Sequence, residues 1–81
     1  MSNTGDQRKQ ATNLFDPPKT AYINDGLEGV DGNAYAVLGH FRKQALSQDW
    51  SAEDIAKVLT EAQTDDYEYL LATILKHIES D

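Results

Sequence analysis

The chain has 81 residues, no cysteine and a formal net charge of −7, from 14 acidic and seven basic residues. A sequence this short forms at most one small domain, and without cysteine it has no disulfide, thiolate metal site or thiol nucleophile. No apolar run reaches the roughly 20 residues needed to cross a bilayer, and the polar N-terminus lacks the apolar core of a signal peptide. The sequence therefore predicts a cytoplasmic protein.

The acidic excess is uneven along the chain. Residues 48–81 carry nine acidic residues against Lys57 and Lys76, a net charge of −7, whereas residues 1–20 carry a net charge of +1. Such a surface repels nucleic acid and anionic membrane and attracts a basic partner. The alternative is that the charge serves only solubility.

Residues 1–24 are predicted to form a flexible N-terminal arm. The first 14 residues are polar and unpatterned, which is typical of disordered segments, and Pro17-Pro18 excludes a helix. Three side chains are too apolar for a simple linker, and some of them should fold back onto the helices: Phe15, Tyr22 and Ile23. The alternative is that Phe15–Pro18 is a docking peptide for another protein.

Residues 25–81 are predicted to form a three-helix domain, so the fold class is an all-α, small three-helix bundle. A turn-rich loop with Asp-Gly twice leads into a first helix over residues 33–47. Asp31 or Asn33 can cap it, and one face is apolar: Ala34, Val37 or Leu38, Phe41 and Ala45.

The second helix has a capping-box pattern, Ser51 with Asp54, and Trp50 and Ile55 have the spacing of a hydrophobic staple. The third helix should begin near Thr64 or Asp65. Its predicted apolar face comprises Tyr67, Leu70, Leu71, Ile74, Leu75 and Ile78. A core of about 50 residues rarely yields more than ~3–5 kcal/mol, so either the arm or a second copy in a homodimer should cover it.

No catalytic or cofactor site is predicted. His40 and His77 have no partner at metal-ligand spacing, and no nucleophile has an assignable base. The acidic loop fails the calcium template in both registers, and its three glycines are followed by no phosphate-binding lysine. We therefore expect no enzyme activity, no cofactor and no metal.

The remaining constellation is a set of carboxylates at the two junctions between helices. If the junctions lie close together, these side chains form one acidic edge that could imitate phosphates and bind a basic protein. The alternative is that helix N-termini simply favour acids. The predicted partner-binding residues are Asp49, Glu53, Asp54, Glu61, Asp65, Asp66 and Glu68.

The run Asp31-Gly32-Asn33-Ala34-Tyr35-Ala36-Val37-Leu38-Gly39, with Glu61-Ala62 and Asp66-Tyr67-Glu68-Tyr69-Leu70-Leu71, resembles a family of small proteins encoded by bacteria and their phages. The resemblance covers roughly Asp31 to Ile78 and implies no assigned activity. The sequence departs from the family at Asp49-Trp50, where it lacks a glycine, and in its longer N-terminal arm.

These observations predict a small acidic protein that binds another macromolecule, a phage-type inhibitor or regulator of a basic, nucleic-acid-handling host protein. One alternative is a small-ligand binder that uses the start of the first helix: Asp31, Asn33, Tyr35 and His40. The other is a structural component of a larger assembly, recruited by the Phe15–Ile23 arm.

Overall fold

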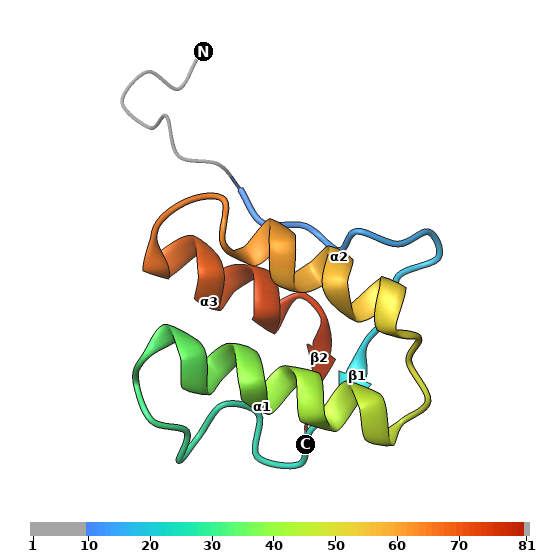
Figure 1. Cartoon of the computed structure of the whole chain (residues 1–81), viewed down its shortest axis with the longest axis horizontal. Coiled ribbons are helices and arrows are strands. Elements are labelled where there is room, and N and C mark those ends of the chain that lie inside the picture. The colour runs from blue at the N-terminus through green and yellow to red at the C-terminus, as the bar shows by residue number, and fades with distance from the viewer. Residues whose placement is uncertain (1–9, 81) are drawn as a thin grey trace.

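A computed structural model describes residues 10–80 and shows three helices and a two-stranded parallel sheet (Figure 1). The elements follow the order β1 (Ala21–Tyr22), α1 (Ala34–Ser47), α2 (Ala52–Ala62), α3 (Tyr67–Leu75) and β2 (Ile78–Glu79). The prediction of a small, mostly helical fold is confirmed. The short sheet was not predicted, because two-residue strands leave no periodic pattern in a sequence.

Each helix begins at a side chain that accepts a hydrogen bond from the first turn. Asn33 caps α1 by accepting from the backbone N–H of Ala36 at 2.8 Å, and Ser51 caps α2 by accepting from that of Asp54 at 3.1 Å. The cap of α3 is Asp66, which accepts from the N–H of Tyr69 at 2.9 Å. The first two starts agree with the sequence prediction, whereas α3 begins later than expected.

The end of α1 is a Schellman motif built on a non-glycine residue. The N–H of Trp50 donates to the carbonyl of Ala45, and the N–H of Asp49 donates to that of Leu46. Asp49 has a φ of 69°, in the left-handed region where glycine is usual. The reversed chain direction places Trp50 under α1, where its ring meets Phe41 edge-on at 5.4 Å.

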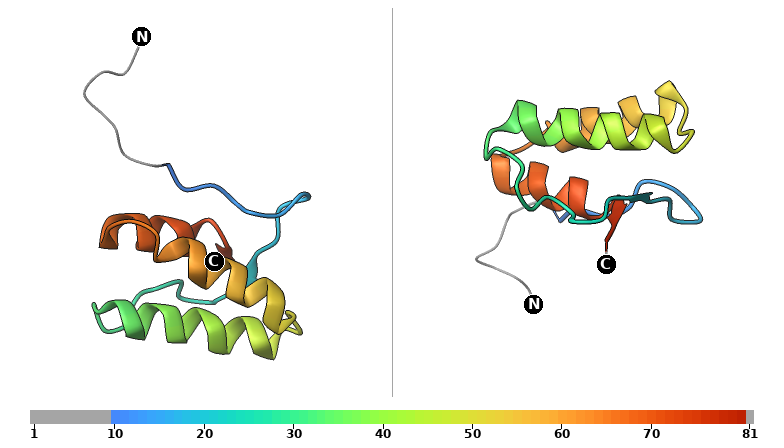
Figure 2. Two further views of the ribbon diagram at one scale, coloured as in Figure 1. Left: turned by 45° about the horizontal axis from the view of Figure 1, so that its top comes forward. Right: turned by 90° about the horizontal axis from the view of Figure 1, so that it is seen from below.

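Successive helices run in opposite directions, so α1 and α3 point the same way (Figure 1). Seen from below, α3 and the strands lie in one layer, and α1 and α2 lie in the other (Figure 2). The core between them is drawn from all three helices, from Trp50 and from β1. Its buried members are Ala21, Val37, Leu38, Phe41, Ala45, Trp50, Ile55, Val58, Ala62, Leu70 and Ile74.

The sheet joins a segment near the start of the described chain to its C-terminal end. Ala21 is in register with Ile78, and the N–H of Ala21 donates to the carbonyl of His77 at 2.8 Å. The side-chain amide of Gln48 binds β1 on its other edge, where it accepts from the N–H of Tyr22 and donates to its carbonyl, both at 2.7 Å. A side chain at the end of α1 therefore occupies the place of a neighbouring strand.

The predicted apolar face of α3 is partly wrong. Leu70 and Ile74 are buried, but Leu71 is only half-buried, and Tyr67 and Leu75 are exposed, with Leu75 at 53%. The other buried side chains of this region are Tyr69, Thr73 and His77. The buried face is rotated because Tyr69 binds Glu61 of α2 and the segment before β1 covers His77.

The prediction of a flexible arm over residues 1–24 is not confirmed for its described part. Ile23 is buried, and Phe15 packs edge-on against Trp50 at 5.7 Å, so the expectation that apolar arm residues fold back is confirmed for these two. Tyr22 is exposed at 45%. Residues 1–9 lie outside the described residues, and the domain boundary between residues 24 and 25 stays a prediction.

Candidate functional site

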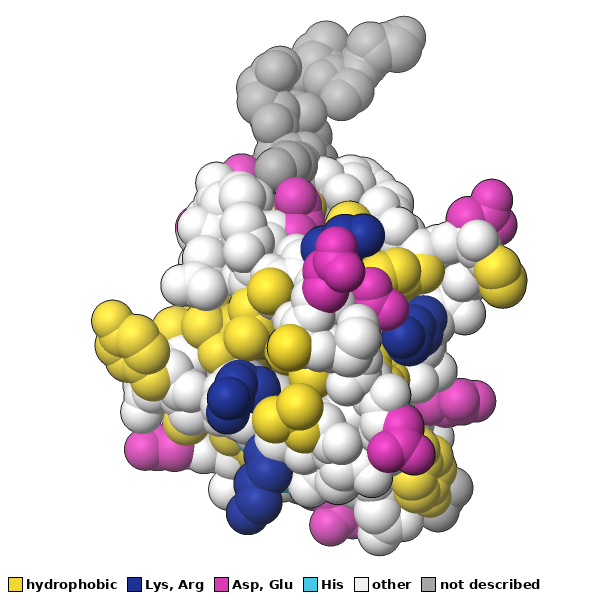
Figure 3. Space-filling view, turned by 45° about the vertical axis from the view of Figure 1, so that its right-hand side comes forward, with side chains coloured by type: hydrophobic (Ala, Val, Ile, Leu, Met, Phe, Trp, Pro, Cys, Tyr) yellow, Lys and Arg dark blue, Asp and Glu magenta, His cyan; other side chains and the backbone are white. Residues whose placement is uncertain are grey.

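The predicted acidic residues form two groups rather than one edge. Asp49, Glu53 and Asp54 lie where α1 meets α2, and the other four lie around the junction of α2 with α3. The 11 residues of α2 separate these junctions, a distance of about 16 Å at 1.5 Å per residue. On the face beside the first junction, acidic side chains are scattered among basic and hydrophobic ones (Figure 3).

Several of these carboxylates have partners within the chain. Asp54 binds the Lys19 ammonium at 2.7 Å, and Asp66 caps α3. Asp65 accepts from the backbone N–H of Asp66 at 2.8 Å, and Glu61 accepts from the Tyr69 hydroxyl. The preference of helix N-termini for acids explains Asp54, Asp65 and Asp66 without any partner protein. Asp49, Glu53 and Glu68 are exposed.

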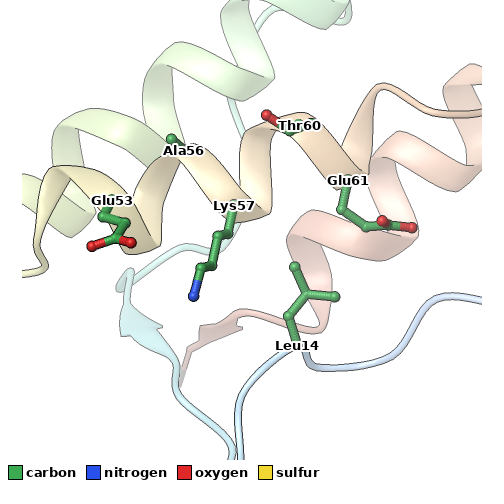
Figure 4. A pocket seen from close by; sticks show the side chains of 6 residues that line it. All are labelled: Leu14, Glu53, Ala56, Lys57, Thr60 and Glu61. Atoms are coloured by element: carbon green, nitrogen blue, oxygen red, sulfur yellow. The ribbon is translucent and has the colours of Figure 1, made fainter.

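A shallow groove runs along the outer face of α2 and is closed on one side by the segment before β1 (Figure 4). Most of its exposed lining is apolar, with Leu14 facing the helix. Carboxylates lie toward both ends of the helix. The lining residues are Leu14, Glu53, Ala56, Lys57, Thr60 and Glu61. Leu14 could not be selected from the sequence, because it is a single apolar residue in a segment that was predicted to be disordered.

A second cluster surrounds His77, which is completely buried although it lies just after α3. Its Nε2 accepts a hydrogen bond from the backbone N–H of Leu14 at 2.9 Å, and its Nδ1 lies 2.7 Å from the carbonyl oxygen of Thr73. Since a backbone N–H can only donate, Nε2 carries the lone pair and Nδ1–H donates to Thr73. Burial lowers the pKa of His77, and the bond to Thr73 partly opposes this shift.

The Lys19 ammonium occupies an aromatic corner beside this cluster. Its Nζ lies 4.6 Å from the centroid of the Trp50 ring and 5.7 Å from that of Phe15. Both distances fall within the range of a cation–π attraction. Lys19 is also the main cause that lowers the pKa of Asp54. This one lysine therefore ties the segment before β1 to the start of α2.

The four residues of the predicted small-ligand site do not converge. Asn33 is used as the cap of α1, and its side-chain amide also donates to Asp31 at 3.2 Å. Tyr35 is 85% exposed, and His40 lies seven residues beyond Asn33, about two helical turns further on. Among residues 10–80, no group of three or more histidine or acidic side chains could hold a metal ion.

Comparison with known proteins gives no match: no family model, no curated protein and no solved structure resembles the chain significantly. The resemblance to small bacterial and phage proteins therefore stays a prediction. None of the described helices combines the length and the apolar character needed to cross a membrane.

Proposed function

We propose that this protein, a three-helix bundle with an N-terminal arm, acts in the cytoplasm by binding another protein that has a basic surface. The observation that supports this most directly is the groove on α2. Its apolar lining includes Ala56 on α2 and Leu14 on the facing segment, and the carboxylates of Glu53 and Glu61 lie toward its ends. Apolar contacts surrounded by charge are the usual make-up of a protein interface.

The whole molecule attracts the partner at long range, and the charges beside the contact act on it most strongly, because the attraction between charges weakens with distance. Lys57 lies four residues from both Glu53 and Glu61, so these three side chains carry a net charge of only −1. The chain as a whole carries −7. A field of this size speeds the approach of a basic protein, while the groove determines how well the complex fits.

The narrower proposal is that the partner handles nucleic acid and that this protein regulates or inhibits it. Carboxylates held on a helical scaffold can occupy a channel that normally binds phosphates. The resemblance to phage-encoded proteins supports this role by analogy only. The two-group arrangement of the acids means that such a partner would be contacted along α2, not at one acidic edge.

Two charge-reversal variants test the proposal. Glu53→Lys changes the groove, and Glu28→Lys makes the same change in an exposed loop residue, so both chains carry a net charge of −5. A partner protein captured with the unchanged chain should associate several-fold more slowly with Glu53→Lys than with Glu28→Lys. The difference between the two association rates should narrow as the salt concentration rises, since the Debye length falls from about 10 Å at 0.1 M to about 3 Å at 1 M.

Surface plasmon resonance with the captured partner gives both rates. Equal slowing by the two variants would show that only the net charge matters and that the groove is not the contact. Binding that ignores both substitutions and the salt concentration would contradict the proposal as a whole.

A further inference from the structure

Residues 13–19 form a small closed loop that is held together by one side chain. The amide of Asn13 donates to the carbonyl of Lys19 at 2.9 Å, and its carbonyl oxygen accepts from the N–H groups of Phe15 and Lys19 at 3.0 and 3.2 Å. Because these bonds lie within the loop, they do not depend on the helices. The loop can therefore leave the body of the protein as a unit without losing them.

Few polar contacts attach this loop to the body. Among the described residues they are the hydrogen bond from the Leu14 N–H to His77, the bond from Asn13 to the carbonyl of Lys76 at 2.8 Å, and the Lys19–Asp54 ion pair. Phe15 adds ring contacts, with centroids 5.8 Å from His77 and 5.7 Å from Trp50. Of these contacts, the hydrogen bond to His77 is the one that turns from favourable to unfavourable when the imidazole is protonated.

We propose that His77 is a proton-operated latch, which holds the loop of residues 13–19 on the helices when its imidazole is neutral and releases it when the imidazole is protonated. A neutral ring accepts from Leu14 through Nε2 and donates to Thr73 through Nδ1. An imidazolium has two donors and no acceptor, so the Leu14 N–H and the Nε2–H would face each other with no lone pair between them.

The charged groups around His77 do not stabilise its protonated form. From the loop and from α2, Lys19 and Asp54 neutralise each other beside Phe15 and Trp50. Next along the chain, Lys76 and Glu79 are exposed, and no carboxylate in residues 10–80 pairs with the ring. A buried cation without a counter-ion is costly, so protonation favours the state in which the loop has left and water reaches the ring.

Release would uncover the surface beneath Phe15 and Lys19, including the face of Trp50 over which the ammonium lies. It would also remove Leu14 from the groove on α2. The latch therefore links acidity to the shape of the face that is proposed to bind a partner, although it stands independently of that proposal. Asp54 stays ionised through this change even when Lys19 leaves, because the ordinary pKa of its carboxyl group, 3.8, lies below the pH at which His77 is protonated.

The test follows the full chain from pH 8 to pH 5 with three signals. NMR reports the titration of the His77 ring and the amide of Leu14, and fluorescence reports Trp50, the single tryptophan. All three should change reversibly with one midpoint below pH 6.5, with a red shift of the Trp50 emission. Far-UV circular dichroism should stay constant, because the caps of the three helices are formed by residues outside the loop.

Matched histidine variants separate the latch from general acid effects. His40→Gln should keep the Trp50 transition, and His77→Gln should lose it. A transition that persists in folded His77→Gln overturns the proposal, as does a Leu14 amide that is unchanged while His77 titrates. Loss of the helical signal at the same midpoint also overturns it, because protonation would then unfold the whole chain. If His77→Gln does not fold, the titration of the wild-type chain decides.

Discussion

Single residues at the ends of helices direct the path of this chain. The three caps fix where the helices begin, and their patterns are local, which is why the sequence identified Ser51 and offered Asn33 as one of two candidates, with Asp31. Asp49 differs from these caps because it lies just after the C-terminal end of α1. It adopts a left-handed conformation that aspartate tolerates but glycine favours. The missing glycine at this turn, noted in the sequence, therefore corresponds to a real conformational cost.

We expect Asp49→Gly to raise the free energy of unfolding by about 0.5–1 kcal/mol, because glycine relieves the left-handed strain at the C′ position. Urea denaturation followed by circular dichroism measures the change. Asp49→Ala is the matched control, which removes the same carboxylate without relieving the strain and should not be stabilising. If both variants shifted stability equally and upward, loss of charge rather than backbone conformation would be the cause.

At the scale of elements, α3 shows how tertiary contacts change a face that the sequence defines. Its apolar residues cover more of the helix surface than one interface can bury, so periodicity alone selects a face too broadly. Tertiary neighbours select the buried residues: Leu70 and Ile74 join the hydrophobic core shared with α1 and α2, and the segment before β1 covers His77. The hydroxyl of Thr73 has no hydrogen-bond partner among the described residues.

Ile74→Ala should lower the free energy of unfolding by about 2–5 kcal/mol, the usual cost of an emptied core position, because Ile74 is 0% exposed. Leu71→Ala removes a similar volume from a half-buried position and should cost clearly less. Both variants are compared by their urea midpoints. A larger loss for Leu71→Ala would restore the face predicted from the sequence.

For the whole molecule, the sequence predicted the helices but not the long-range contacts that attach the N-terminal segment to them. Capping boxes, staples and apolar stripes are formed by residues within one or two turns of each other, so they can be read locally. The bond between Leu14 and His77 joins residues 63 positions apart, and neither residue lies in a pattern that points to the other. The candidate groove was missed for the same reason, because Leu14 is brought to α2 only by the complete fold.

The stability of the whole chain should fall as the pH is lowered below about 6.5. The pKa of His77 is lower in the folded protein than its ordinary value of 6.5, so the unfolded chain binds more protons between these two values. The stability from neutral His77 is thus complete above pH 6.5 and is lost as the pH falls toward the folded-state pKa. Thermal melts between pH 8 and 5 check this, and His77→Gln should flatten the dependence.

The Gln48 amide that binds β1 has a consequence for how the protein behaves at high concentration. An open strand edge is a template on which other chains can add and grow into aggregates. At the outer edge of β1, both backbone groups of Tyr22 are already occupied by one side chain. A neighbouring molecule that approached there would find no free donor or acceptor on that residue, so colloidal stability depends on a residue that contributes nothing to the core.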